Sequence, residues 1–141
     1  MENRFCLQMV SCGDGCCGGD SSAGGNVYST EETVCGKWID GKTIYRKVIT
    51  GKLAEDSGNS IAFADVSDLK VETIVDLYGT LLDNISKAQC TLQTSYNRTN
   101  GILAATNMFY SNDGKIYYHY LNNNGNYSNC TATVIIEYTK K

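Results

Sequence analysis

The 141-residue sequence contains no proline, one histidine and one tryptophan, and it has no long apolar run. Without proline, turns must be made by glycine, asparagine and aspartate, which tolerate left-handed backbone conformations. No apolar stretch approaches the ~20 residues that a membrane-spanning helix needs. Residues 1–10 carry polar or charged side chains where a signal peptide would be apolar. We therefore expect no membrane insertion, and production in the cytoplasm of the cell that makes the chain.

An excess of basic residues is also missing. Lysine and arginine total 12 against 15 aspartates and glutamates, which gives a formal net charge of −3. A protein that binds a nucleic-acid backbone usually carries a basic patch or stripe. We therefore expect no nucleic-acid partner.

Groups that could start a reaction are few. His119 lies in a run of tyrosines on a predicted strand, and no nucleophile motif accompanies it. The glycine-rich segment lacks the lysine and hydroxyl residue of a phosphate-binding loop. Four acidic residues could supply a carboxylate pair for glycoside hydrolysis, but their spacing fits a solvated strand face as well: Asp65, Asp68, Glu72 and Asp76. We predict a protein that is not an enzyme and binds no cofactor.

Cysteine, in contrast, is abundant, with seven residues. The count is odd, so at least one thiol is unpaired within a monomer, and cytosolic thiols are normally kept reduced. No separated Cys-x-x-Cys pairs and no nearby histidine support a zinc site within one chain. The N-terminal cysteines can be free, disulfide-linked between subunits, or metal-bound across a symmetric oligomer: Cys6, Cys12, Cys16 and Cys17.

The composition changes near residue 26. Phe5, Leu7 and Met9 alternate with other residues in a weak period of two, and residues 11–26 are almost entirely glycine, serine, cysteine and aspartate. The second stretch resembles a flexible linker. A short apolar peptide on such a linker suits an arm that docks on a neighbouring subunit, or a frayed terminus. We assign residues 1–26 to an N-terminal arm and Gly/Cys-rich linker, and residues 27–141 to one folded domain.

The folded part has the pattern of a β protein. Ten tyrosines and many threonines, valines and isoleucines favour strands. Turn-rich pieces recur every ten or so residues, which predicts an all-β fold: an antiparallel β-sandwich or jelly-roll-like domain with a short flexible N-terminal arm. The only plausible helical turn is at 81–88. Period-two alternation predicts strands at 44–49, 61–64, 71–78, 90–96, 102–110, 115–121 and 132–138.

The pair Asp40-Gly41 lies between two short apolar runs. An Asp-Gly pair in that position predicts a hairpin with a two-residue turn, because a primed turn needs positive φ at its central residues. Trp38 precedes the turn, and we expect its ring to anchor the hairpin against the core. All three residues therefore receive a structural role.

Tyrosines and asparagines in the C-terminal half are the one recognition feature. Aromatic faces and amide groups bind sugars and build protein interfaces. Loops around Asn112 and at 122–127 should meet at one rim of the sandwich, with Tyr127 projecting outward. The alternative is that alternate tyrosines fill the core and place their hydroxyls at its edge. The surface-recognition candidates are Tyr110, Asn112, Asn124 and Tyr127.

Both ends of the folded part carry a specific motif. Residues 28–32 read Tyr-Ser-Thr-Glu-Glu, residues 36–42 read Gly-Lys-Trp-Ile-Asp-Gly-Lys, and residues 44–47 read Ile-Tyr-Arg-Lys. An Asp-rich segment at 68–79 follows, and the last strand ends in Tyr-Thr-Lys at 138–140. This pattern resembles short β domains of bacteriophage virion proteins, particularly tail-fibre and baseplate proteins of phages that infect gut Firmicutes and their relatives.

The resemblance covers residues 28–141, with a looser middle. It implies a virion structural protein, a small fibre or decoration component such as a head fibre, tail fibre or tail adaptor, assembled in the host bacterial cytoplasm. It also implies a homotrimer, since phage fibres are commonly threefold. Its partners would be other virion proteins (capsid, portal or tail), contacted through Phe5, Leu7 and Met9, with host surface polysaccharide as a further candidate. The alternative function is a carbohydrate-binding module without an architectural role.

Overall fold

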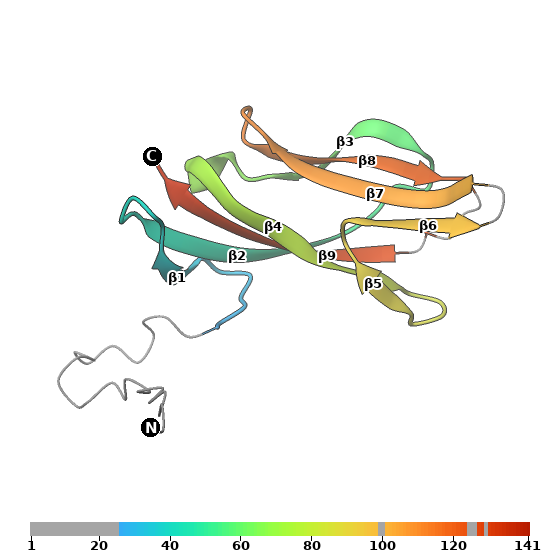
Figure 1. Cartoon of the computed structure of the whole chain (residues 1–141), viewed down its shortest axis with the longest axis horizontal. Helices are drawn as coiled ribbons and strands as arrows, with labels where there is room; N and C mark the ends of the chain where they lie inside the picture. Colours follow the sequence, from blue (N-terminus) through green and yellow to red (C-terminus); the bar gives the residue numbers. More distant parts are fainter. Residues whose placement is uncertain (1–25, 99–100, 124–126, 129) are drawn as a thin grey trace, which may run out of the picture.

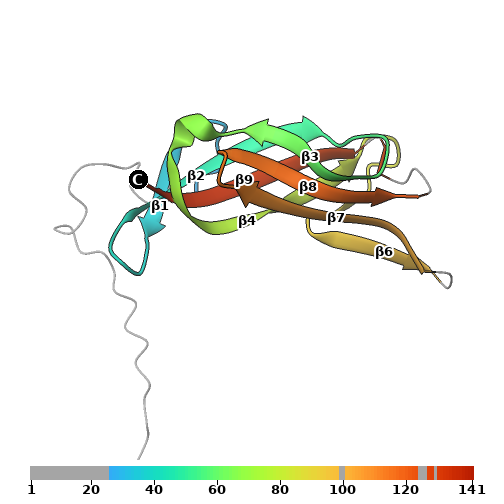
Figure 2. The same ribbon diagram turned by 90° about the horizontal axis from the view of Figure 1, so that it is seen from above.

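Two antiparallel sheets pack face to face and form a β-sandwich (Figures 1 and 2). The structure is a computed structural model that describes residues 26–98, 101–123, 127–128 and 130–141. One sheet has five strands in the order β1-β2-β9-β4-β5, and the other has four in the order β3-β8-β7-β6. The all-β sandwich predicted from the sequence is thus confirmed. The elements are β1 (Thr33–Lys37), β2 (Thr43–Lys52), β3 (Gly58–Asp65), η1 (Ser67–Leu69), β4 (Val71–Asp83), β5 (Gln89–Thr91), β6 (Thr94–Arg98), β7 (Gly101–Ser111), β8 (Lys115–Asn122) and β9 (Cys130–Lys140).

The last strand, β9, is the centre of the five-stranded sheet. It pairs with β2 on one side and with β4 on the other along most of its length. Its side chains alternate, so that Val134, Ile136 and Tyr138 point into the core and are fully buried. The period of two in the sequence is the direct cause, because successive side chains of a strand point to opposite faces.

The core lies between the sheets. β4 contributes Leu81, β7 contributes Met108, and β8 contributes Ile116 together with Tyr118 and Tyr120. The two tyrosines confirm the alternative expectation that alternate tyrosines fill the sandwich. Tyr118 also accepts a hydrogen bond from the Ala54 N–H at 2.8 Å, so its hydroxyl reaches the edge of the core.

Two element predictions are wrong. Of the segment 81–88 predicted as a helical turn, residues 81–83 belong to β4, where Leu81 and Leu82 pair with β9 and β5. Asp83 then accepts hydrogen bonds from the Ile85 N–H and the Ser86 hydroxyl, which close a turn. The single strand predicted at 90–96 is two strands, β5 and β6, separated where Leu92 enters the core and the chain crosses between the sheets.

The first hairpin is confirmed, but its turn is longer than predicted. The Trp38 N–H donates to the Lys42 carbonyl at 2.8 Å, and the Gly41 N–H donates to the Trp38 carbonyl at 2.9 Å, so three residues form the loop. Of these only Gly41 has positive φ, at 86°. Asp40 accepts the Lys42 N–H with its carboxylate at 2.9 Å. A three-residue loop needs one left-handed position, which the glycine supplies.

The prediction for Trp38 is wrong. The residue is only half-buried and belongs neither to the core nor to the partly buried side chains packed against it. It lies directly after Lys37, the last paired residue of the edge strand β1. Within the described residues no helix is long and apolar enough to cross a membrane.

Candidate functional site

Residues 27–32, which we call the N-terminal clasp, lie against the five-stranded sheet. The Ser29 carbonyl accepts the Val48 N–H at 2.8 Å, and the Ser29 hydroxyl accepts the Glu31 N–H at 3.0 Å. The Thr33 hydroxyl, at the start of β1, lies 3.4 Å from the Arg46 carbonyl oxygen that it donates to. From this position the clasp places Tyr28 on the outer face of the sheet and Glu32 on its inner face.

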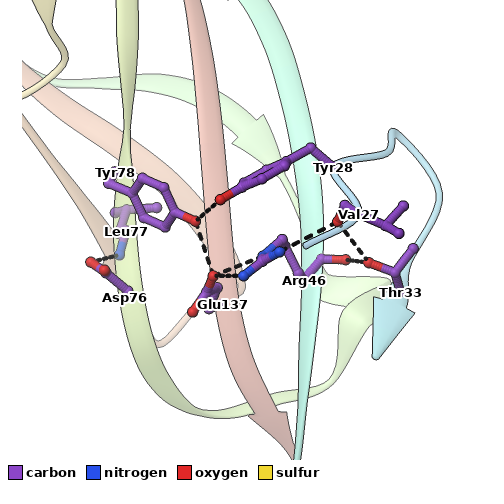
Figure 3. Close-up of polar contacts among 8 residues, drawn as sticks. All are labelled: Val27, Tyr28, Thr33, Arg46, Asp76, Leu77, Tyr78 and Glu137. Carbon is purple, nitrogen blue, oxygen red and sulfur yellow. Dashed lines mark hydrogen bonds and ion pairs between the residues drawn. The ribbon is translucent and has the colours of Figure 1, made fainter. Parts of the chain in front are cut away.

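On the outer face, the clasp covers a buried ion pair (Figure 3). Arg46 donates to Glu137 from Nε at 2.8 Å and from Nη2 at 2.7 Å, and the two side chains are 8% and 15% exposed. The Tyr28 ring lies over the guanidinium, with 4.5 Å from Cζ to the ring centroid. The Tyr78 hydroxyl donates to the same carboxylate at 3.0 Å. The Glu137 carboxylate and the Arg46 guanidinium thus compensate each other away from water.

Titration of this cluster follows from its geometry. Burial opposes the charge of Arg46, but the hydrogen bond and the charge of Glu137 outweigh burial and raise the pKa of the guanidinium. Burial and the hydrogen bonds of the phenol to Tyr28 and Glu137 raise the pKa of Tyr78. Arg46 and Tyr78 therefore both keep their protons near neutral pH.

On the inner face, the clasp carboxylate of Glu32 accepts hydrogen bonds from the Tyr138 hydroxyl and from Lys140 Nζ, the latter at 2.6 Å. Lys140 Nζ also lies 4.5 Å from the centroid of the Tyr45 ring, which stacks on Tyr138. Burial alone would raise the pKa of Glu32, but the hydrogen bonds from Lys140 and Tyr138 outweigh it and lower the pKa. The clasp thus joins the first and the last motif of the sequence.

The residues predicted for surface recognition do not come together as a site. Tyr127 is 8% exposed and stacks on Tyr120, so the prediction that it projects outward is wrong. The cause is Asn122, whose side-chain oxygen accepts the Tyr127 N–H at 3.1 Å and holds this segment over the core. Tyr110 is half-buried and packs against the core, whereas Asn112 is exposed in the β7–β8 turn.

Other predicted residues lie outside the described residues. They are the recognition candidate Asn124, the attachment candidates Phe5, Leu7 and Met9, and the cysteines Cys6, Cys12, Cys16 and Cys17. Their roles, and the division of the chain near residue 26, stay predictions.

Three outward-facing rings of β7 and β8 form a stack, which we call the ring platform: Phe109, Tyr117 and His119. Phe109 and Tyr117 are directly opposite across the two strands, with centroids 6.0 Å apart and ring planes 24° apart. Phe109 also stacks on His119 at 4.9 Å and 29°. Alternation along the strand puts Tyr117 and His119 on one face, but it does not indicate that this face points to solvent.

Shallow pockets flank the ring platform. One has a volume of about 230 Å³ and the other about 290 Å³. The first is lined by Asn59, Ala105, Thr106, Asn107, His119, Tyr120 and Leu121. The second is lined by Ser60, Phe109, Ser111, Asp113 and Tyr117. Hydroxyl, amide and carboxylate groups therefore surround the rings.

Hydrogen bonds hold the outer rings of the platform in place. The Tyr117 hydroxyl donates to Asp113 at 2.6 Å, and this bond is the main cause of a lowered pKa for that carboxyl. The Ser60 N–H donates to Nδ1 of His119 at 3.2 Å. This bond fixes the orientation of the imidazole ring on the platform.

A further pocket of about 260 Å³ opens between β5 and β6. Cys90 and Cys130 line it together with Tyr127 and Leu81. Burial raises the pKa of both thiols, to about 11 for Cys130. Both therefore stay protonated near neutral pH, and a thiol is a poor nucleophile.

The acidic residues considered for hydrolysis are exposed and serve local structure. Asp65 accepts hydrogen bonds from Ser67, Glu72 pairs with Lys42, and Asp76 accepts the Leu77 N–H at 2.8 Å. In the described part of the chain, no group of three or more histidine, cysteine, aspartate or glutamate side chains is arranged to hold a metal ion.

Comparisons of the chain with protein-family models, with curated proteins and with solved structures found no match. The case for a function therefore depends on the sequence pattern, the N-terminal clasp and the ring platform.

Proposed function

We propose that the protein is a structural component of a bacteriophage virion, a small fibre or decoration protein and not an enzyme. The observation that carries this proposal is the contact between the two ends of the sequence pattern. Glu32 belongs to the first motif, and its partners Tyr138 and Lys140 belong to the last. The two motifs that carry the resemblance therefore belong to one cluster of the fold.

The attachment side of the proposal concerns residues 1–26. The described part of the chain begins at residue 26, directly before the N-terminal clasp, and the clasp is followed by the edge strand β1. An apolar peptide with a period of two can add a strand to a partner sheet or fill a groove on it. In the proposal, Phe5, Leu7 and Met9 make this contact with a capsid, portal or tail protein, and three copies associate through β surfaces.

The direct test is the composition of the particle. Phage particles purified by density should contain the protein, detected by mass spectrometry and by antibody labelling in electron micrographs. The copy number should be consistent with threefold symmetry. A protein that is abundant in the lysate and missing from purified particles would overturn the proposal.

The ring platform favours a second candidate, a carbohydrate-binding module without an architectural role. Aromatic rings flanked by amide and hydroxyl groups are features that sugar-binding surfaces need. The two candidates differ in where the protein is found. A free module would bind glycans but would be absent from particles.

A further inference from the structure

We propose that the ring platform and its flanking pockets bind a neutral glycan, with a pyranose ring stacked on the exposed aromatic surface. This inference deepens the proposed function and depends on it only for the source of the glycan, which would be the polysaccharide of the host surface. The binding residues that we assign are Phe109, Tyr117 and His119, with Asn107 and Asp113 as polar partners.

Stacking is the first part of the fit. One face of a pyranose consists of C–H groups, and such a face packs on an aromatic ring while the sugar hydroxyls point sideways. Phe109 and Tyr117 are half-buried, and His119 is exposed on the outer face of the four-stranded sheet. Phe109 stacks between Tyr117 and His119 with nearly parallel ring planes, so the faces left for a sugar are the outer faces of Tyr117 and His119. Each of these two rings lines one of the flanking pockets.

The polar rim is the second part. A sugar hydroxyl both donates and accepts, so its site needs groups of both kinds. Asn59 and Asn107 line one pocket, and both amides can donate and accept. Ser60, Ser111 and Asp113 line the other. The pockets lie on either side of the rings, where the hydroxyls of a stacked sugar would point.

Charge decides between neutral and acidic glycans. Asp113 lines one pocket, and Asp65 lies opposite Lys115 on the neighbouring strand. Lys115 faces both carboxylates, and its single positive charge offsets only one of them. This end of the platform therefore keeps one net negative charge. The whole chain also carries a net charge of −3. An anionic polysaccharide is therefore repelled, and a neutral one is not.

The platform is ordered before binding. The hydrogen bond from Tyr117 to Asp113 and the bond from Ser60 to His119 fix the outer rings. A ligand then loses less of its binding free energy to the ordering of side chains.

The experiment uses the purified full chain on a microarray of neutral and anionic bacterial oligosaccharides, followed by affinity electrophoresis in gels that contain the neutral polysaccharides that bind. We expect binding to neutral glycans. We expect Tyr117→Ala and Phe109→Ala to weaken it about tenfold or more, as for an aromatic anchor at the centre of a contact. The control is Ile85→Ala, which removes an apolar side chain that is 75% exposed in the turn between β4 and β5 of the other sheet. This variant should bind like the wild type.

Two more variants keep the result clear. Tyr117→Phe keeps the ring and loses the bond to Asp113, so it should retain most of the binding. If an alanine variant fails to fold by circular dichroism, Phe109→Leu replaces it, because leucine retains apolar volume without a ring. The proposal is overturned if no neutral glycan binds, if only anionic glycans bind, or if loss of the rings leaves binding unchanged.

A change of molecular mass in light scattering for Tyr117→Ala would also overturn it, since the rings would then form an interface between copies. Failure of the virion proposal gives a different result. In that case the protein binds neutral glycans but is missing from purified particles. If the glycan proposal alone fails, particles contain the protein and the array shows no binding.

Discussion

Two buried tyrosines of β8 differ in the surroundings of their hydroxyls. Tyr118 accepts the Ala54 N–H at 2.8 Å, whereas the Tyr120 hydroxyl is buried with no hydrogen-bond partner among the described residues. Burial is the main reason that the pKa of each phenol is raised. A buried polar atom without a partner has lost its hydrogen bonds to water and gained nothing in exchange.

The two tyrosines should therefore respond in opposite ways to the same change. Tyr120→Phe removes the unpaired hydroxyl and should raise the free energy of unfolding by about 1 kcal/mol, while Tyr118→Phe leaves the Ala54 N–H unpaired and should lower it by about 1 kcal/mol. Urea unfolding followed by circular dichroism measures both. An equal loss in both variants would show that the Tyr120 hydroxyl has a partner.

Gly79 is fixed by the close approach of β9. Its φ is +151°, and a Cβ placed there would lie 1.9 Å from the carbonyl oxygen of Thr133. Gly79→Ala should thus lower the free energy of unfolding by about 3 kcal/mol or more, because the backbone has to move. Gly36→Ala is the matched control, since its Cβ would meet only Ile44 at 3.8 Å. Thermal unfolding and soluble yield of the Gly79→Ala and Gly36→Ala variants measure the difference. Equal stability of the two variants would contradict the close approach of β9 to β4 at Gly79.

At the scale of elements, the N-terminal clasp makes stability depend on pH. The pKa of Glu32 is lowered from its ordinary value of 4.5. A carboxyl with a lowered pKa stabilises the folded state above its unfolded pKa, and this contribution is lost as the pH falls through the folded pKa. The N-terminal clasp should therefore weaken below about pH 4.5.

Glu32→Gln tests this dependence. At about pH 7 the variant should be less stable than the wild type by about 1 kcal/mol, the value of a charged hydrogen bond reduced for partial exposure. The difference should shrink towards about pH 3, where the wild-type carboxyl is protonated as well. The measurement is the melting temperature across this pH range. A difference that stays constant with pH would show that the carboxylate charge is not involved.

Most strands could be predicted from the sequence because alternation depends only on the pleat and on one buried face. Long strands such as β7, β8 and β9 follow this rule. The break between β5 and β6 could not be predicted, since it depends on distant groups. The Gln93 side chain donates to the Met108 carbonyl at 2.8 Å and accepts the Met108 N–H at 2.9 Å, in place of a strand.

The candidate site was harder to predict than the strands. Alternation places Tyr117 and His119 on one face and Tyr118 and Tyr120 on the other, but only the packing of the two sheets decides which face is outside. Tyr127 was assigned to the surface because it lies among turn residues. The bonds of Asn122 to this segment, which no local pattern indicates, turn it into the core.

At the scale of the whole molecule, the boundary of the folded unit should lie at the N-terminal clasp. Deletion of residues 1–26 should leave the melting temperature unchanged, because in the proposal the arm buries no part of the sandwich core. The same deletion should prevent incorporation into particles, because in the proposal the arm makes the contact with the partner protein. Deletion of residues 1–32 should lower the melting temperature, since it removes Tyr28 and Glu32 and exposes the Arg46–Glu137 pair.

Calorimetry of both deletion variants and of the full chain measures their melting temperatures and so locates the boundary of the folded unit. Loss of folding in the shorter deletion would place the arm within the sandwich. Full incorporation of that variant into particles would instead show that attachment runs through the domain itself.

The position of the N-terminal clasp also determines how the domain responds to mechanical force. A hairpin held only at the edge of a sheet is peeled away one hydrogen bond at a time when its end is pulled. Tension on residue 27 is instead divided between Arg46 on β2, which bonds the Val27 carbonyl and is paired with Glu137, and β9. On β9, Tyr138 and Lys140 bond the Glu32 carboxylate of the clasp. Because β9 is paired on both sides, this load acts on many backbone hydrogen bonds at once. A load applied at residue 27 therefore acts on the centre of the five-stranded sheet and not on its edge alone.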